Sequence, residues 1–286
     1  MRGVNFPSSV KNQRFLTASP QGEAFGRYRA SACKQQFALI SLGKELIFQP
    51  LRDILKMHKI YAERLGFHMY TINDLFDLSH TLAADYLGQF TYPWEALKGI
   101  KDFIVQLGSN LSMDDFTEIT PQVWVHKTAK VFPSAYLGAP CIIGANSEVR
   151  HCAFIRSSAL VGENCVVGNS VELKNVILFD NVQVPHYNYV GDSILGYKSH
   201  MGAGSITSNV KSDKSLVVIH SDPEIPTGIK KVGAMLGDYV EVGCNSVLNP
   251  GTVIGRNSSI YPLSCVRGVV PENSIYKANE NIVKKV

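Results

Sequence analysis

Four features between residues 156 and 204 have chemistry that could serve a reaction. Arg156 and Lys174 are cations eighteen residues apart, His186 follows a proline, and Gly202-Ala203-Gly204 is a glycine-rich turn. An Arg–Lys pair suits a phosphate group, since arginine binds it through two parallel hydrogen bonds and lysine adds a point charge. Neutral histidine is the usual general base near pH 7, and backbone N–H groups of such a turn can bind an oxyanion.

Each feature also has an ordinary interpretation. Two cations held close together repel unless an anion lies between them, but Arg156 and Lys174 could instead form a solvated basic stripe. A single histidine such as His186 is more often structural than catalytic, and a glycine triplet alone is weak support for a site. The arrangement of these residues therefore depends on the elements that carry them.

A six-residue repeat surrounds these features. Every sixth residue is aliphatic from Val131 to Leu173 and again from Leu236 to Val266, and a small residue follows most of these anchors by four positions. This pattern is the signature of a hexapeptide β-helix, in which each hexad forms a short strand, the anchor fills the interior and the small residue fits the corner. Three hexads make one coil, so Arg156 and Lys174 should project from the same face, one rung above the other.

The repeat changes register twice near His186. Leu178 follows Leu173 after five residues, and Leu195 follows Val190 after another five. Slips of this kind re-aim side chains without ending the solenoid. We therefore expect the stretch that contains His186 to direct its side chains differently from the regular coils.

The composition excludes several classes of protein. The chain has 286 residues, 45% hydrophobic and 18% charged, with a formal net charge of +4, which does not suggest a nucleic-acid partner. No apolar run approaches the roughly 18 residues of a membrane span, so we expect no membrane partner. None of the six cysteines forms a C-x-x-C pair. We interpret them as small buried fillers rather than disulfides or metal ligands, which indicates a cytoplasmic protein.

The chain divides into four regions. Residues 1–56 are basic and aperiodic, and we expect a disordered arm or a non-functional upstream segment. Residues 57–118 should form a helical cap, residues 119–275 the β-helix with an excursion at 211–232, and residues 276–286 a polar tail.

One helix of the cap is clearly amphipathic. It carries Leu97, Ile100, Ile104 and Leu107 on one face, and Gly108 is a natural stop. We expect the cap to cover the base of the β-helix, since the ends of a solenoid must be covered.

Three segments, VGNSVELK, PHYNYVGDSILG and GAGSITSN, resemble the acetyltransferase half of the bifunctional sugar-1-phosphate uridylyltransferase/glucosamine-1-phosphate acetyltransferase family. The segment GIKKVGAMLGDYVEVG is similar to its archaeal members. The resemblance covers roughly residues 119–275 and implies a mainly β fold, a left-handed parallel β-helix that associates as a homotrimer. It also implies transfer of an acetyl group from acetyl-CoA to the amine of an amino-sugar 1-phosphate or a nucleotide amino sugar, without a metal ion.

The resemblance also implies roles for individual residues. His186 would be the catalytic base that deprotonates the amine. Apart from the resemblance, Glu172 or Asp192 could orient its ring, and the sequence does not choose between them. The sugar phosphate would be held by Arg156, Lys174 and Tyr189, and acetyl-CoA would be bound near Ala203 and Asn209. Five lysines could serve the anionic groups of coenzyme A or be ordinary solvated side chains: Lys198, Lys211, Lys214, Lys230 and Lys231.

The sequence departs from the family at two site positions. His200 replaces an asparagine that contacts the sugar, so the identity of the sugar is open, and Val210 replaces a tyrosine in the coenzyme A region. Residues 1–118 contain no glycine-rich nucleotidyl loop, so we expect no nucleotidyltransferase domain.

Two alternatives remain at this point. The chain could be a non-catalytic binding or regulatory β-helix related to sugar-nucleotide pyrophosphorylases. A metal enzyme of the carbonic-anhydrase type shares the fold, but His151, His186 and His200 lack the closely spaced pair that such a site needs.

Overall fold

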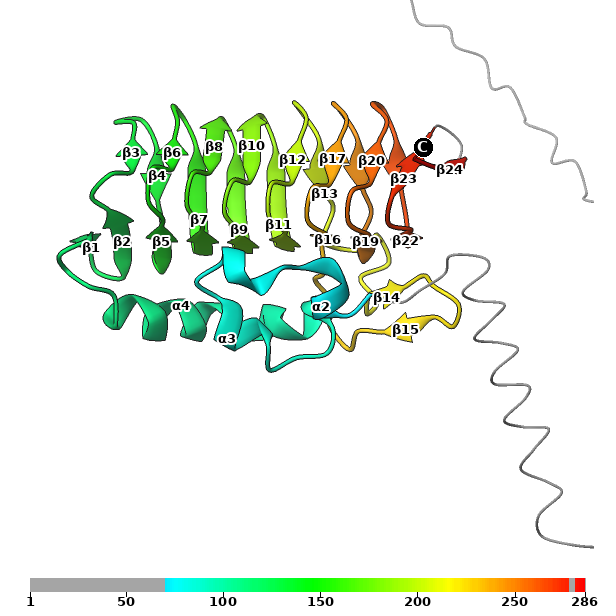
Figure 1. The fold of residues 1–286 in the computed structure, drawn as a ribbon, viewed down its shortest axis with the longest axis horizontal. Helices are drawn as coiled ribbons and strands as arrows, with labels where there is room; N and C mark the ends of the chain where they lie inside the picture. The colour runs from blue at the N-terminus through cyan, green and yellow to red at the C-terminus, as the bar shows by residue number, and fades with distance from the viewer. Residues whose placement is uncertain (1–69, 278–280, 286) are drawn as a thin grey trace, which may run out of the picture. The chain divides into compact units, whose positions relative to one another are not determined.

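The computed structural model describes residues 70–277 and 281–285. Most of this part of the chain forms a parallel β-helix of stacked short strands, and the helices lie along one side of it (Figure 1). The predicted fold class, a mainly β, left-handed parallel β-helix with a small helical part before it, is confirmed. The expectation for residues 1–56 falls outside the described residues, as does the beginning of the 57–118 region.

One side of the β-helix, which we call face 1, is a sheet of its own. Its strands are parallel and in register, with Val149 opposite Val167 and Val167 opposite Val184. In stacking order they are β3 (Lys130–Val131), β6 (Glu148–Val149), β8 (Val166–Asn169), β10 (Gln183–His186), β12 (His200–Met201), β17 (Glu241–Val242), β20 (Ser259–Ile260) and β23 (Ser274–Tyr276), followed by the antiparallel β24 (Ile282–Lys284).

The other two sides form one continuous sheet, because three long strands bend around the corner between them: β7 (Phe154–Val161), β9 (Glu172–Leu178) and β11 (Tyr189–Leu195). The first halves of these strands make face 2 together with β4 (Tyr136–Leu137), β13 (Ile206–Thr207), β18 (Val247–Leu248) and β21 (Cys265–Val266). Their second halves make face 3 together with β2 (Val123–His126), β5 (Cys141–Ile143), β16 (Ala234–Leu236), β19 (Thr252–Ile254) and β22 (Val269–Val270). The antiparallel β1 (Phe116–Thr120) precedes β2 and covers the first coil.

Left-handed backbone conformations mark the corners of the coils. From residue 146 to residue 170 a non-glycine residue with positive φ occurs at every sixth position. The spacing shortens to five between Ser170 and Asn175 and again between Tyr187 and Asp192. These short turns produce the two register slips predicted in the sequence, which are thereby confirmed.

The described cysteines are all free, but their environments differ. Cys141 and Cys165 are buried, as predicted for corner fillers. Cys152, Cys244 and Cys265 are exposed, so the prediction of burial was wrong for these three. Cys265 occupies the outward position of β21, beside an anchor that points inward.

From residue 70 onward, where the described part begins, five short helices precede the β-helix: α2 (Ile72–Leu75), η1 (Leu78–His80), α3 (Ala84–Leu87), η2 (Pro93–Lys98) and α4 (Ile100–Ser109). Helix α4 packs across β5, β7 and β9, and η2 packs on β11 (Figure 1). The helices therefore cover face 3, and the prediction that they cover the base was wrong. The reason is that the outward positions of face 3 are apolar and fully buried: Ile142, Leu160, Ile177, Ile194, Met235 and Val253.

Helix α4 has the predicted apolar face but not the predicted end. Ile100 and Ile104 are buried against the core, as is Leu97 in the preceding helix η2. The helix continues through Gly108 to Ser109. A Cβ at Gly108 would lie 2.2 Å from the ring of Trp124, so this glycine allows the helix to approach face 3 closely rather than stopping it.

Residues 211–232, which we call the arm, leave the coil and return to it. The arm contains a hairpin, formed by β14 (Val218–Ile219) and β15 (Ile225–Pro226). Its two ends meet at Asn209, whose carbonyl accepts the Val232 N–H at 3.1 Å. The arm is therefore rooted at the corner between faces 2 and 3.

Candidate active site

Arg156 and Lys174 both lie at the corner between faces 2 and 3, but they do not stack as predicted. The register of β7 shifts between Ile155 and Ser157, so Ser157 rather than Arg156 pairs with Lys174 of β9. The repeat that runs from anchor Ile155 to the next anchor in β7 is six residues long. The repeat stacked on it, from Leu173 to Leu178 in β9, is five residues long. One residue of the longer repeat must bulge outward, and that residue is Arg156.

The chain itself supplies an anionic partner for each of these cations. Lys174 Nζ lies 2.8 and 3.1 Å from the two carboxylate oxygens of Asp192. Arg156 Nη1 lies 3.6 Å from Glu172 Oε1. We expected a bound anion to offset the repulsion between the cations, but these carboxylates already do so. The Arg156 side chain is 57% exposed and the Lys174 side chain 22%, so both remain within reach of a ligand.

The two acids expected to orient His186 are engaged elsewhere. Asp192 accepts hydrogen bonds from Lys174 and from two asparagines, while Glu172 faces Arg156. Among the described residues no side chain forms a hydrogen bond with the His186 ring. The expected contact is absent because Asp192 lies at the corner between faces 2 and 3, and Glu172 directs its carboxylate to Arg156.

His186 ends β10 at the corner between faces 1 and 2, with an exposed side chain. Its backbone N–H donates to Asn188 Oδ1 at 3.1 Å, and its carbonyl accepts the Gly204 N–H at 3.0 Å. Asn188 Nδ2 also donates to Gly202 O at 2.8 Å. The buried Asn188 thus fixes the backbone of His186 against the glycine-rich turn. The role of Asn188 was not predicted from the sequence. An amide at a corner position that normally holds a small residue is nevertheless a detectable signal.

The turn offers a backbone donor next to His186. Gly204 has a φ of +71°, and a Cβ there would lie 2.2 Å from Asn245 Oδ1, so any other residue would require the Asn245 amide to move. The Ala203 carbonyl accepts the Asn245 N–H at 2.9 Å. Within the described residues no group accepts the Ala203 N–H. This N–H can therefore donate to a ligand oxygen.

Tyr189 and Asn209 join the cationic corner in one network. Asn209 Nδ2 donates to Tyr189 Oη at 3.1 Å and to Asp192 Oδ2 at 2.6 Å. Burial raises the pKa of the Tyr189 hydroxyl, which therefore keeps its proton at neutral pH and can donate it to a ligand. Three residues predicted to bind substrates, Lys174, Tyr189 and Asn209, are brought together here.

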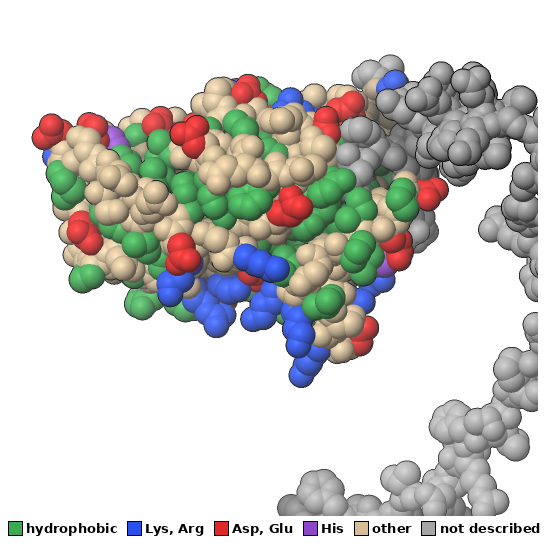
Figure 2. Space-filling model, turned by 90° about the horizontal axis from the view of Figure 1, so that it is seen from below, with side chains coloured by type: hydrophobic (Ala, Val, Ile, Leu, Met, Phe, Trp, Pro, Cys, Tyr) green, Lys and Arg blue, Asp and Glu red, His purple; other side chains and the backbone are tan. Residues whose placement is uncertain are grey.

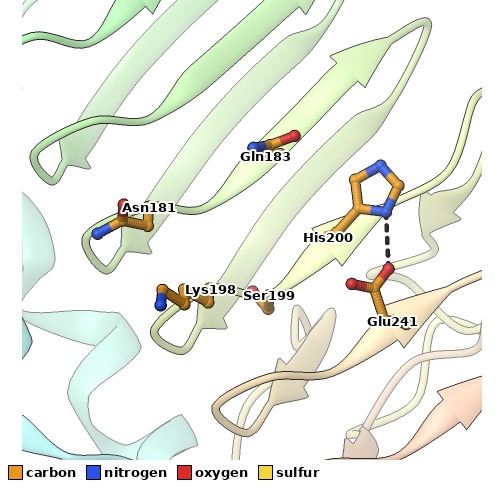
Figure 3. Close-up of a pocket in the computed structure, with 6 residues that line it drawn as sticks. All are labelled: Asn181, Gln183, Lys198, Ser199, His200 and Glu241. Carbon is orange, nitrogen blue, oxygen red and sulfur yellow. Dashed lines mark hydrogen bonds and ion pairs between the residues drawn. The ribbon is translucent and has the colours of Figure 1, made fainter.

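His200 lies on face 1, away from this network. It is the register partner of Gln183, and its Nδ1 is 2.8 Å from Glu241 Oε2. Because Gln183 and His186 are three residues apart in β10, His200 lies roughly 10 Å along face 1 from His186. His200 lines a hollow of about 310 Å³ together with Asn181, Gln183, Lys198, Ser199 and Glu241. Figure 3 shows these six side chains and the bond between His200 and Glu241. One chain therefore does not bring His200 and Lys174 into the same hollow.

The lysines assigned to coenzyme A occupy two places. Lys198 lies at the corner between faces 3 and 1, with Nζ 5.2 Å from the ring centroid of Tyr197 and 5.8 Å from that of Tyr239. The others belong to the arm: Lys211, Lys214, Lys230 and Lys231. Figure 2 shows that Lys and Arg side chains gather along one edge of the side that carries the helices.

In residues 70–277 and 281–285 no group of three His, Cys, Asp or Glu side chains could hold a metal ion. In the same part of the chain, no helix has the length and apolar character needed to cross a membrane.

Stacked hexads, left-handed corners and a histidine beside a glycine-rich turn define a hexapeptide-repeat β-helix protein. A family model described as the GMPPB C-terminal domain matches residues 140–269. A protein from Methanococcus maripaludis named bifunctional protein GlmU is 32% identical over 204 residues, which cover 70% of this chain and 49% of that protein. A bifunctional sugar-1-phosphate nucleotidylyltransferase/acetyltransferase from Sulfurisphaera tokodaii is 29% identical over 189 residues, or 65% of this chain and 47% of that protein.

The solved structures include a hexapeptide transferase family protein from Anaplasma phagocytophilum, with 15% identity and a TM-score of 0.33. That match covers 57% of this chain and 78% of the other. These relatives confirm the resemblance to the bifunctional sugar-1-phosphate nucleotidylyltransferase/acetyltransferases that was drawn from the sequence. The chain spans about half the length of the curated relatives it matches, 49% and 47% for these two.

Proposed function

We propose that this chain is an N-acetyltransferase that uses acetyl-CoA to acetylate an amino-sugar 1-phosphate or a nucleotide amino sugar. The observation that carries the proposal is the pairing of His186 with the Gly202–Gly204 turn, joined by the hydrogen bond from the Gly204 N–H to the His186 carbonyl at 3.0 Å. A base and an oxyanion donor on adjacent rungs are what acyl transfer to an amine requires. The name of the Sulfurisphaera tokodaii relative, which includes an acetyltransferase, supports the same reaction class.

In the proposed reaction the amine nitrogen attacks the carbonyl carbon of the acetyl thioester. His186 takes the proton that the nitrogen loses, and the Ala203 N–H donates to the carbonyl oxygen as negative charge develops on it. Collapse of the intermediate breaks the carbon–sulfur bond and forms the amide. The imidazolium then returns its proton, and coenzyme A leaves as a thiol.

The acceptor would lie across face 2. Its amine would face the edge that carries His186, and its phosphate would face the edge that carries Arg156 and Lys174. The exposed guanidinium of Arg156 would bind the phosphate first, and Lys174 would add a charge already oriented by Asp192. Lysines of the arm, including Lys214, would serve the anionic groups of coenzyme A.

The proposal includes a homotrimer. Large apolar side chains are exposed around the site: Tyr187 is 65% exposed, Leu263 79% and Tyr136 60%. Exposed apolar surface around a shallow site marks a region that another surface covers. A neighbouring copy would convert the open corner beside His186 into a groove. Light scattering should therefore give the mass of a trimer, and a monomer at micromolar concentration would contradict this part of the proposal.

A thiol-release assay tests the activity. Acetyl-CoA is offered with a panel of amino-sugar 1-phosphates and nucleotide amino sugars, and free coenzyme A is measured with a thiol reagent. At least one acceptor should release thiol with the wild type and not with His186→Ala. Absence of release with every acceptor, in a protein that still binds coenzyme A, would refute the proposal.

The match to the GMPPB C-terminal domain favours a second candidate, a non-catalytic β-helix related to sugar-nucleotide pyrophosphorylases. Such a protein would bind a sugar nucleotide but release no thiol. It would also bind that ligand equally well with and without His186, because a base is not needed for binding. Calorimetry on the wild type and His186→Ala separates the two functions.

A further inference from the structure

Asp192 is a buried carboxylate at the corner between faces 2 and 3. Lys174 Nζ lies 2.8 Å from Oδ1 and 3.1 Å from Oδ2, and Asn175 Nδ2 donates to Oδ1 at 2.9 Å. Asn209 Nδ2 donates to Oδ2 at 2.6 Å. Each carboxylate oxygen of Asp192 therefore contacts Lys174 and accepts a hydrogen bond from one asparagine, and these contacts fix the three side chains.

These donors come from separate parts of the chain. Lys174 and Asn175 belong to β9, and Asn175 Nδ2 also donates to the carbonyl of Leu97 in the helical layer at 3.1 Å. Asn209 directly precedes the arm. The backbone carbonyl of Asp192 accepts the N–H of Gly233, directly after the arm, at 2.8 Å. Asp192 thus joins β9 to both ends of the arm.

Residues assigned to each of the two substrates of the proposed reaction contact this carboxylate. Lys174 is assigned to the acceptor phosphate and Asn209 to acetyl-CoA, and Asn209 also contacts Tyr189 Oη at 3.1 Å. Ion pairs with a buried partner hold their geometry better than exposed ones, because water competes less for the charges. Arg156 and Glu172 provide the contrast, since their exposed pair at 3.6 Å has no link to Asn209.

We propose that Asp192 is a positioning residue that aligns the phosphate-binding Lys174 with Asn209, so that its loss weakens the binding of acceptor and of acetyl-CoA together. The inference rests on the proposed function. It assigns Asp192 to both substrate sites instead of to His186, where the sequence suggested a role for it. Residues that serve one substrate alone, such as Arg156, should not show this double effect.

The first test is Asp192→Asn. An amide at this position can accept through one oxygen only, so its NH₂ group must face the donor of Asn175 or of Asn209. The KM for the acceptor and the KM for acetyl-CoA should each rise about 10-fold, the scale of one lost hydrogen bond to a charged group. The kcat should change less than either KM, because the His186 and Ala203 corner is untouched. Titration calorimetry with coenzyme A and with glucosamine 1-phosphate as probes should show the same two losses without turnover.

Asp238→Asn is the matched control. Asp238 is equally buried and accepts the N–H groups of Asp77 and Tyr197 at 2.7 and 2.9 Å, with Arg256 at 3.4 Å, but it lies at the other corner of face 3. This variant should lower stability while leaving both KM values within about twofold, because it touches no substrate residue. Arg156→Ala should raise the KM for the acceptor alone.

The outcomes separate the alternatives. A rise in only one KM in Asp192→Asn, or equal rises in Asp238→Asn, would overturn the inference. If Asp192→Asn does not fold, the wild type provides the test. Saturating glucosamine 1-phosphate should then change the Kd for coenzyme A at least threefold. An unchanged Kd would overturn the inference. A wild type that binds neither probe and releases no thiol would overturn the proposed function, and this inference with it.

Discussion

The two cations assigned to the acceptor phosphate should differ sharply in what they contribute to stability. Lys174→Met keeps most of the side-chain volume but leaves the buried Asp192 without a cation. Breaking a buried ion pair by removing one partner costs about 3–5 kcal/mol. The Lys174 side chain is 22% exposed, and two asparagines still donate to Asp192 in this variant. We therefore expect a smaller loss of stability, about 2–3 kcal/mol.

Arg156→Met removes a cation from the same corner but should cost less than about 1 kcal/mol. The guanidinium is 57% exposed and lies 3.6 Å from Glu172, and exposed pairs of this kind contribute little. The double variant Lys174→Met/Asp192→Asn should recover much of the loss, since it leaves no unpaired buried charge.

Thermal unfolding followed by circular dichroism measures these differences. For a domain of this size a loss of about 2–3 kcal/mol corresponds to a fall in Tm of about 4–12 °C. Arg156→Met should fall by less than about 4 °C on the same scale. Equal shifts for the two single variants, or a double variant less stable than Lys174→Met, would refute the assignment of Asp192 as the buried partner of Lys174.

The remaining predictions concern the base, the interior and the helical layer. His186→Ala should lower kcat by about 10²–10⁴-fold without changing coenzyme A binding, and turnover above about a third of the wild-type value would assign the base elsewhere. Burial raises the pKa of Cys141 and of Cys165 to about 12. Only the unfolded chain then releases these protons above about pH 9, so the free energy of unfolding should fall with rising pH by up to about 1.4 kcal/mol per pH unit for each thiol. Urea unfolding of the wild type and Cys165→Ala at pH 8 and pH 10 checks this, and identical pH slopes would contradict it. Leu160→Ala should cost about 2–4 kcal/mol in urea unfolding because it opens a cavity under α4. Met113→Ala, at an exposed position outside the site, should cost less than about 0.5 kcal/mol. Equal losses would show that face 3 is not the covered face.

The coil architecture could be predicted from local sequence because each hexad is a nearly independent unit. The anchors of this repeat, such as Ile155 and Leu173, are fully buried, and the five-residue steps at Leu178 and Leu195 reappear as shortened corner turns. Face 3 was detectable as well, since the outward positions beside its anchors are apolar, as at Leu160 and Ile177. Apolar residues at these outward positions predict that face 3 is covered. The sequence therefore held a signal against the prediction that the helices cover the base.

Side-chain partners could not be obtained in this way, because a partner depends on the register between coils. The sequence by itself determined the β-helix, its slips, the arm, and the candidate residues Arg156, Lys174 and His186. Only the tertiary structure decided that Arg156 bulges from β7, that Asp192 holds Lys174 and Asn209, and that Asn188 ties His186 to the glycine-rich turn. A difference of one residue between stacked repeats selects which side chains face each other, and that difference takes effect only when the coils pack.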